Sequence, residues 1–376
     1  MSKAGIYLHI PFCKTKCIYC DFYSVTKRED SIDEFIDCLI KEIKLNQKTL
    51  KNHTFDTIFF GGGTPSVLSA QQIEKILNQL DKFYDLDKNI EVTLECNPGE
   101  INFEKLRDFR GLGINRLSIG FQSFNDSLLK FLGRLHSAEQ SISTYNDAQR
   151  AGFDNINVDL IYDIPNQRVK DWKNDLFLAT NLDPNHISAY SLTVEKNTAL
   201  HSMVKNKRVC MPSEKIDKKM FLETIEYLES KGYGHYEISN FSKKDKQCRH
   251  NLHYWRLEPY LAFGPGAHGF DGTKRWWNKK SIDHYIRSLN KNQSPIQSEE
   301  ILSDKDSFNE TIMNGLRLME GAQIEKLSDH LQVDIDTHLQ PYIDKWPYID
   351  NNGKNLRLKK EGLLFTDEII ADLFLI

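Results

Sequence analysis

Residues 11–21 carry the strongest signal in the chain and read Pro11-Phe12-Cys13-Lys14-Thr15-Lys16-Cys17-Ile18-Tyr19-Cys20-Asp21. Cysteine thiolates are the ligands of iron–sulfur clusters. Three cysteines within eight residues can wrap one loop around a 4Fe–4S cubane, with each thiolate binding a different iron. The fourth iron then lacks a protein ligand, so a small molecule such as S-adenosylmethionine can chelate it through its amino and carboxylate groups. We predict that Cys13, Cys17 and Cys20 hold such a cluster.

These cysteines could also serve a structural zinc site or form a redox pair. Structural zinc would need a fourth Cys or His nearby, and His9 is the candidate, although it lies on a predicted strand. A pair of buried or redox-active cysteines would not need the triple spacing. Four further cysteines are scattered along the chain and are predicted to be core thiols: Cys38, Cys96, Cys210 and Cys248. Seven cysteines in a chain without a signal peptide do not suggest a disulfide framework.

The first two thirds of the chain repeat one pattern, in which a short apolar run is followed by a turn and then by helical periodicity. Helices are predicted over Ile32–Leu45 and Ala70–Phe83, for example. Six βα units in a row predict a parallel sheet covered by helices, either as a partial barrel or as an open doubly wound sheet. The predicted strands are Gly5–His9, Thr57–Phe60, Glu91–Glu95, Arg116–Gly120, Asn155–Leu160 and His186–Ser191.

In both architectures the ligand site lies at the carboxyl ends of the strands, and the unusual residues fall there. The cysteine loop follows the first strand, and Gly61-Gly62-Gly63-Thr64-Pro65 follows the second. Glu95 ends the third predicted strand, Gln122 follows the fourth, and Asp159 is near the end of the fifth. Glycines let a backbone approach a ligand closely, although the same run could be a tight strand-to-helix turn. A P-loop is excluded because no Gly-Lys-Ser/Thr follows.

Composition and charge narrow the class of protein. The 376 residues carry a net charge of −4, which argues against nucleic acid as a partner. No apolar run is long enough to cross a bilayer and none reads as a signal peptide, so we expect a cytoplasmic protein with at most peripheral membrane contact.

The βα pattern ends near residue 290, which predicts two domains, 1–290 and 291–376. From residue 303 the sequence indicates short helices, a hairpin over residues 356–365 and a last helix, as in a winged-helix-like module. Residues 301–376 contain 8 Lys/Arg and 14 Asp/Glu, a net charge of −6, which is the wrong sign for binding phosphates. We expect a structural or partner-docking domain.

The CxxxCxxC loop after the first strand, together with the glycine-rich turn after the second, resembles the radical SAM superfamily. The resemblance implies a partial (β/α)6 barrel that binds a 4Fe–4S cluster and S-adenosylmethionine. It also implies that polar residues at the strand ends and two tyrosines line the cofactor pocket. The cofactor-binding residues predicted in this way are Tyr7, Tyr19, Gly62, Gly63, Thr64, Glu95, Gln122, Arg134 and Asp159.

A second glycine motif, Gly264-Pro265-Gly266-Ala267-His268-Gly269, matches GxGxxG. A dinucleotide-binding fingerprint should open a helix within a βαβ unit. Here Pro265 lies within the turn, and Asp271-Gly272-Thr273-Lys274 follows, so we reject that reading. The segment instead resembles a loop that closes over the cofactor.

Residues 6–13, Ile-Tyr-Leu-His-Ile-Pro-Phe-Cys, and the motifs above resemble the oxygen-independent coproporphyrinogen III oxidase family (HemN) over nearly the whole chain. The true oxidases carry a further cysteine two residues after the third cluster ligand, where this chain has Phe22. Residues 248–255, Cys-Arg-His-Asn-Leu-His-Tyr-Trp, are similar to the heme chaperone branch of the family, called HemW. A histidine can ligate heme iron and aromatic rings can cover a porphyrin, so His250, Tyr254 and Trp255 are the predicted heme residues, with His253 as a weaker candidate.

The resemblance therefore implies a heme chaperone that hands heme to acceptor proteins, including respiratory proteins at the membrane, and it is compatible with a homodimer. One alternative is oxidative decarboxylation of coproporphyrinogen III by a deoxyadenosyl radical, against which Phe22 counts. A radical SAM enzyme with an unrelated substrate is a further alternative. A pure scaffold protein would give no reason for an open cluster site.

Overall fold

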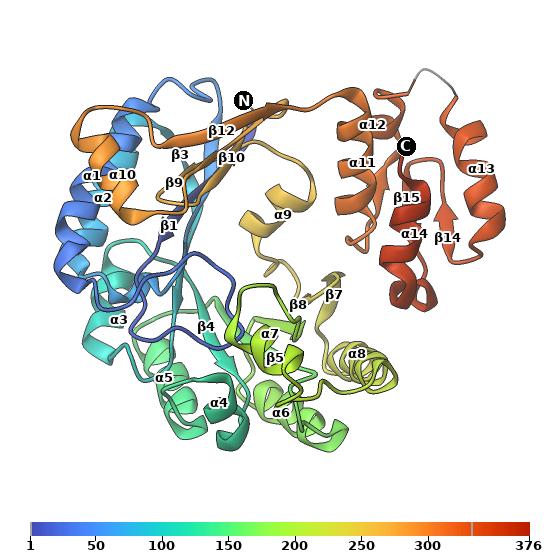
Figure 1. Ribbon diagram of the computed structural model, residues 1–376, viewed down its shortest axis with the longest axis horizontal. Helices are drawn as coiled ribbons and strands as arrows, with labels where there is room; N and C mark the ends of the chain where they lie inside the picture. The colour runs from blue at the N-terminus through green and yellow to red at the C-terminus, as the bar shows by residue number, and fades with distance from the viewer. Residues whose placement is uncertain (1, 332–333) are drawn as a thin grey trace.

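The computed structural model describes residues 2–331 and 334–376, and these residues form a curved, twelve-stranded sheet with an attached C-terminal lobe (Figure 1). The order of strands in the sheet is β12-β11-β10-β9-β1-β2-β3-β4-β5-β6-β8-β7. The strands are β1 (Lys3–Ile10), β2 (Thr54–Gly62), β3 (Asp85–Cys96), β4 (Arg116–Gln122), β5 (Ile156–Tyr162), β6 (His186–Ser191), β7 (Gly234–Glu237), β8 (Asn240–Ser242), β9 (Tyr260–Phe263), β10 (His268–Phe270), β11 (Lys274–Asn278) and β12 (Ile296–Ile301).

The order of the first six strands distinguishes a partial barrel from a doubly wound sheet. β1 to β6 are neighbours in chain order, and each adjacent pair is parallel. A doubly wound sheet would reverse its order at a switch point, whereas a barrel continues in one direction. β1 has β9 as its other neighbour and β6 has β8, so the parallel strands do not close on each other. The predicted partial (β/α)6 barrel and its six strands are confirmed.

Amphipathic helices cover the outside of the sheet. In α1 the buried residues include Phe35, Leu39 and Ile43, which recur every four residues and so share one face. The helix α2 begins at a capping box made by Ser69 and Gln72. The helices of this part are α1 (Ile32–Leu45), α2 (Ala70–Phe83), α3 (Phe103–Gly111), α4 (Asp126–Leu132), α5 (Ala138–Arg150), α6 (Val169–Asn181), α7 (Ala199–Lys205), α8 (Glu214–Ser230), α9 (Arg249–Trp255) and α10 (Ile282–Asn290), with short 3-10 turns η1 (Glu29–Ser31) and η2 (Pro65–Val67).

The C-terminal lobe lies beside the open side of the barrel, at the right of Figure 1, and α9 lies between the two parts. It combines helices with a small antiparallel sheet of order β13-β15-β14. Its elements are α11 (Asp304–Gly315), β13 (Ala322–Gln323), α12 (Ile324–Ser328), α13 (Ile335–Lys345), β14 (Ile349–Asn351), β15 (Asn355–Leu358), the 3-10 turn η3 (Lys360–Phe365) and α14 (Thr366–Leu373).

The structure corrects one expectation about this lobe. The hairpin predicted over residues 356–365 is wrong, because β15 pairs with the preceding β14 and residues 360–365 form η3. The turn lies at Asn352 and Gly353, where Gly353 has a φ of 78° that suits glycine. The division between 290 and 291 stays a prediction. Since β12 pairs with β11 in the large sheet, we propose a boundary after Ile301.

Within the described residues, none of the helices combines the length and the apolar character needed to cross a membrane.

Candidate functional site

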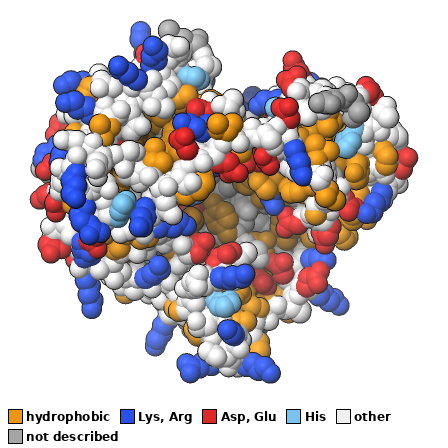
Figure 2. Space-filling view, turned by 45° about the horizontal axis from the view of Figure 1, so that its top comes forward, with side chains coloured by type: hydrophobic (Ala, Val, Ile, Leu, Met, Phe, Trp, Pro, Cys, Tyr) orange, Lys and Arg blue, Asp and Glu red, His pale blue; other side chains and the backbone are white. Residues whose placement is uncertain are grey.

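A cavity of about 1030 Å³ lies at the carboxyl ends of the barrel strands, and Figure 2 shows the surface hollowed between the barrel and the C-terminal lobe. Ligand pockets usually measure roughly 300 to 1,000 Å³, so this one could hold a large ligand or two smaller ones. All three cysteines of the N-terminal loop and all nine predicted cofactor-binding residues line it. Parallel strands therefore bring to one place residues that are up to about 150 positions apart in the sequence.

The cysteine loop is held to the rest of the barrel by backbone and side-chain contacts. The backbone N–H of Cys13 donates to Val25 O over 2.9 Å. The hydroxyl of Thr64 donates to Cys13 Sγ over 3.5 Å, and Arg134 Nη1 donates to Cys17 Sγ over 3.6 Å. Burial raises the pKa of Cys20 to about 11, so without a bound metal its thiol is neutral. Donors to sulfur and three thiols on one loop suit thiolate ligands of an iron–sulfur cluster.

The structure also bears on the other ways of binding a metal. In the part of the chain that the structure describes, no three His, Cys, Asp or Glu side chains are grouped so as to hold one metal ion. A cluster has a different requirement, because each cysteine binds a different iron. His9 Nε2 is within hydrogen-bonding distance, 2.8 Å, of the carbonyl oxygen of Tyr23, which engages the histidine proposed as the fourth zinc ligand. Three of the scattered cysteines are buried as predicted, whereas Cys210 is exposed.

The glycine turn packs directly against the cysteine loop. The N–H of Gly63 donates to Ile10 O over 2.8 Å. A Cβ at Gly63 would lie 2.7 Å from Phe12 O, which is closer than real Cβ atoms approach other atoms. Gly62 has a φ of 106°, and a Cβ there would lie 2.6 Å from the His9 ring. Both positions therefore require glycine, and they fix the loop relative to the turn.

Two partly buried carboxyl groups, Glu95 near the end of β3 and Asp159 in the middle of β5, line the cavity. Glu95 accepts a hydrogen bond from the N–H of Gly62 over 3.3 Å. Burial, together with the nearby charge of Asp159, raises the pKa of Glu95 to about 8. Burial also raises the pKa of Asp159, although Ser118 Oγ and Asn157 Nδ2 donate to its carboxylate. A cationic ligand group in the cavity would stabilise the ionised form of Glu95.

Arg134 connects the cysteine loop with the polar part of the cavity. Its Nη2 donates to Asn97 Oδ1 over 2.6 Å and to the carbonyl oxygen of Gly120 over 2.9 Å. Asn97 in turn donates to Thr64 Oγ1 over 3.0 Å. Gln122 has a φ of 68°, an uncommon conformation for a residue with a side chain, and β4 shifts register there. Such strain often occurs at ligand sites.

The predicted heme residues do not all lie at the cavity. Among the described residues of α9, Asn251 and Tyr254 line it, whereas His250 and Trp255 do not. His250 is fully buried, and its Nδ1 and Nε2 lie 2.8 Å from Thr57 Oγ1 and 2.9 Å from Tyr254 Oη. Burial, and the charge of His253, lower the pKa of His250 well below its usual value, so the ring is neutral. Heme ligation by His250 stays a prediction, and it would require the ring to give up a hydrogen bond.

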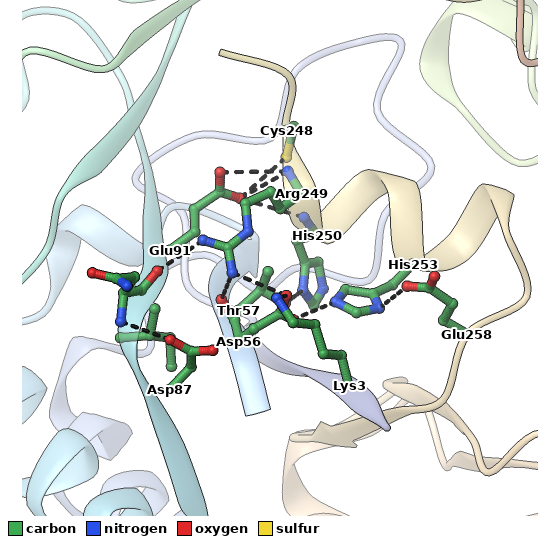
Figure 3. A network of polar contacts seen from close by, with 12 residues as sticks. Lys3, Asp56, Thr57, Asp87, Glu91, Cys248, Arg249, His250, His253 and Glu258 are labelled. Atoms are coloured by element: carbon green, nitrogen blue, oxygen red, sulfur yellow. Dashed lines mark hydrogen bonds and ion pairs between the residues drawn. The ribbon is translucent and has the colours of Figure 1, made fainter. Parts of the chain in front are cut away.

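Figure 3 shows why α9 has a fixed position. His253 Nε2 donates to Asp56 Oδ1 over 2.7 Å, and Nδ1 forms an ion pair with Glu258 at 2.6 Å. Arg249 Nη2 donates to Asp56 Oδ2 over 2.9 Å. The carboxylate of Glu91 accepts from the backbone N–H groups of Arg249 and His250 at the start of the helix. These charges attach α9 to β2 and β3.

Comparison with known proteins places the chain in a family. It is 32% identical to the heme chaperone HemW of Bacillus subtilis over 97% of both chains. It is 34% identical to the heme chaperone HemW of Haemophilus influenzae over 100% of this chain and 98% of that protein. The chain belongs to the HemW family of heme chaperones.

The two parts of the chain match known domain families separately. Residues 7–179 match the radical SAM superfamily, and residues 302–365 match the HemN C-terminal domain. A relative from Danio rerio, a mitochondrial radical S-adenosyl methionine domain-containing protein, is 30% identical over 99% of this chain and 87% of its own length. The structure of coproporphyrinogen III oxidase (HemN) from Escherichia coli superposes with a TM-score of 0.84, covering 99% of this chain and 90% of that one at 21% identity, which shows a common fold.

Within this member of the HemW family, Trp255 has a place that its sequence context did not suggest. It packs against a small apolar cluster made by Tyr236, Leu252 and Leu318. Leu318 follows α11, so the cluster joins α9 to the C-terminal lobe. The GxGxxG segment, residues 264–269, follows β9 and runs into β10, so it does not open a helix as a dinucleotide-binding fingerprint would. Its residues are not among those that line the cavity.

Several cavity residues escaped the sequence analysis. Asn97, Ser118 and Tyr162 line the cavity beside predicted residues. Two of them could have been found, because Asn97 lies two residues after Glu95 and Ser118 lies on the same side of β4 as Gln122. The C-terminal lobe also contributes Arg317 and Leu363. Their sequence gave no indication, since their place depends on how the lobe packs against the barrel.

Proposed function

We propose that this chain binds heme and passes it to acceptor proteins, while carrying a 4Fe–4S cluster and S-adenosylmethionine. One observation supports this more than any other: the cysteine loop, the polar strand ends and Tyr254 of α9 all line the same cavity. Membership of the HemW family, whose relatives are named heme chaperones, supports heme as the ligand that is transferred. A single chamber would let the cofactors lie beside the heme.

In this proposal Cys13, Cys17 and Cys20 hold the cluster. Thr64 and Arg134 donate to the sulfurs of Cys13 and Cys17, which would stabilise the thiolates and orient the loop. Gly63 keeps the loop against the turn after β2. A bound cluster with S-adenosylmethionine supplies one-electron chemistry, and the chain contributes orientation and exclusion of water.

The proposed S-adenosylmethionine site lies next to this loop. Glu95 and Asp159 are partly buried carboxyl groups that suit an ammonium group and ribose hydroxyls. Gln122, Tyr7 and Tyr19 complete the lining on that side. The Gly62–Thr64 turn lets the backbone approach the ligand.

The proposed heme segment runs from His250 to Trp255, and Asn251 and Tyr254 are its contacts with the cavity. The apolar part of the lining includes Phe22, Phe221, Leu192 and Leu363, which suit the faces of a porphyrin. Phe22 is a large apolar side chain that is 63% exposed, so a hydrophobic ligand or partner would cover it with a gain in stability.

We also propose that acceptors include respiratory proteins at the membrane, that contact with the membrane is peripheral, and that the protein acts in the cytoplasm. We further propose that the protein assembles as a homodimer.

The experiment that tests the function is heme titration of the anaerobically purified chain, followed by mixing with an apo-acceptor of higher heme affinity. We expect stoichiometric binding and transfer that is faster than release of free heme into buffer. A Cys17→Ser variant should lack the cluster, whereas Cys210→Ser, at an exposed position, should keep it. Absence of heme binding by cluster-loaded protein, or formation of protoporphyrinogen from coproporphyrinogen, would contradict the chaperone proposal.

A further inference from the structure

Two residues of α9 line the cavity, Asn251 and Tyr254, and the hydroxyl of Tyr254 is paired with an imidazole. Tyr254 lines the cavity, and its Oη lies 2.9 Å from Nε2 of His250. We propose that Tyr254 is the protein ligand of ferric heme iron and that His250 is a positioning residue that holds its oxygen. This inference rests on the proposed function, because it assigns the heme site within it.

His250 itself is poorly placed to reach iron. Its side chain is fully buried, and both ring nitrogens are already within hydrogen-bonding distance of a partner. The ring stacks with Phe59 at a centroid distance of 5.2 Å and with Tyr7 at 6.3 Å. A Cβ at Gly5 would lie 3.0 Å from its Nδ1, so even the backbone of β1 packs closely against the ring. The imidazole could not leave this position without moving the barrel wall.

The other candidates in the segment are also engaged. His253 is held between Asp56 and Glu258, and it is 2% exposed. Trp255 packs on Leu318 at the contact with the C-terminal lobe. Within residues 2–331 and 334–376, no histidine lines the cavity. A histidine ligand from this segment would therefore require rearrangement, whereas Tyr254 already lines the cavity.

A second tyrosine–histidine pair lies in the same cavity and must be distinguished from the first. Tyr7 Oη lies 3.1 Å from Nδ1 of His9. His9 touches the glycine turn, since a Cβ at Gly62 would lie 2.6 Å from its ring. This pair therefore belongs to the side of the cavity that we assign to S-adenosylmethionine. Tyr254 lies on α9, which faces the C-terminal lobe. We therefore assign the pair of Tyr254 and His250 to the heme.

Tyrosine is an established type of heme ligand, and it binds ferric iron as the phenolate. In the proposed step the O–H bond of Tyr254 breaks and an Fe–O bond forms. The proton leaves to water in the cavity, and His250 stays neutral as the tautomer in which Nε2 carries the hydrogen and Nδ1 accepts from the Thr57 hydroxyl. The iron remains ferric, so the step requires no electron donor or oxidant. After binding, the N–H at Nε2 would donate to the coordinated oxygen and fix the orientation of the Tyr254 ring.

The test is a ferric heme titration of the full, cluster-loaded chain with resonance Raman and electron paramagnetic resonance spectra. We expect high-spin ferric heme with phenolate vibrations that shift when the tyrosines are isotopically labelled. Tyr254→Phe should lose these bands and release heme at least tenfold faster. Tyr190→Phe, at another tyrosine that lines the cavity, should keep the phenolate bands and the wild-type rate of heme release. His250→Gln should keep the phenolate bands at shifted frequency, with affinity weakened several-fold.

Each other outcome has a defined meaning. An imidazole-ligated, low-spin spectrum in the wild type that disappears in His250→Gln would overturn the assignment, as would phenolate bands that survive Tyr254→Phe or disappear in Tyr7→Phe. A wild-type spectrum without phenolate bands would overturn it even if the variants failed to fold. Failure of the cluster-loaded wild type to bind heme would instead overturn the proposed function, and this inference with it.

Discussion

His253 donates a hydrogen bond to Asp56 over 2.7 Å, although 197 positions separate the two residues and their side chains are only 3% and 6% exposed. Burial opposes the charge on His253, but hydrogen bonding to Asp56 and Glu258 outweighs it and raises its pKa to about 9. The same contacts, with Arg249, hold the pKa of Asp56 well below its usual range despite burial. This buried ionic contact joins α9 to β2 and so fixes the position of Tyr254.

The first prediction concerns the pH dependence of stability. The folded-state pKa of His253 lies above the unfolded value of 6.5, so its contribution is fully present below pH 6.5 and is lost as the pH rises through about 9. This difference corresponds to about 3 kcal/mol at about 1.36 kcal/mol per pKa unit. We expect the free energy of unfolding of the wild type, relative to His253→Gln, to fall by up to that amount between pH 6.5 and 9.5, as measured by urea denaturation.

A matched control is His201→Gln, at a helix position away from these carboxylates, which should follow the wild type at every pH. If the free energy of unfolding depends on pH in the same way for the wild type and His253→Gln, folding does not raise the pKa of His253.

The second prediction is that Gly63→Ala lowers the cluster content of the protein. A Cβ at this position would meet the carbonyl oxygens of Phe12 and Ile10 at 2.7 and 2.8 Å, so the backbone next to Cys13 must move. We expect the iron content after anaerobic reconstitution to fall by half or more. Gly111→Ala is the control, because a Cβ there meets nothing within 4 Å. Equal iron content in both variants would contradict the proposed role of the turn.

The third prediction is that Glu95→Gln weakens binding of S-adenosylmethionine by tenfold or more. A hydrogen bond to a charged group contributes about 1.5–3 kcal/mol, which the amide would largely lose. Binding to an ammonium group requires the carboxylate, so wild-type affinity should rise as the pH passes through about 8, and the variant should lack this rise. Isothermal titration calorimetry of cluster-loaded protein measures the affinity for S-adenosylmethionine and its dependence on pH. Glu195→Gln, at an exposed residue of the cavity lining, should change affinity little.

The fourth prediction concerns the contact between α9 and the C-terminal lobe. Leu318 is 3% exposed and packs with Trp255, Leu252 and Tyr236. Leu318→Ala should lower the free energy of unfolding by about 2–5 kcal/mol, as for other buried leucines. It should also make the lobe more sensitive to limited proteolysis. Leu222→Ala, at an exposed leucine, should stay within about 0.5 kcal/mol of the wild type.

Much of the barrel could be predicted because its signals are local. Each predicted strand is a short apolar run, and each falls on one of the strands β1 to β6. One rule placed Glu95, Gln122 and Asp159 together, since parallel strands present their carboxyl ends at one edge. Tyr7, Tyr19 and Arg134 were predicted from the resemblance to the radical SAM superfamily. The hairpin near residue 356 was misplaced because apolar residues continue into η3, and alternation alone does not locate a turn.

The sequence by itself determined the cysteine loop and the succession of strands, because spacing and apolar patterning along the chain carry that information. The set of residues around the proposed cofactors was predicted from a resemblance to a known family. Only the tertiary structure decided which residues of the His250–Trp255 segment line the cavity. His250 is buried and lies within hydrogen-bonding distance of Thr57, 193 positions away, and Trp255 packs against Leu318 of the C-terminal lobe. Such contacts depend on the packing of distant elements, which no local pattern encodes.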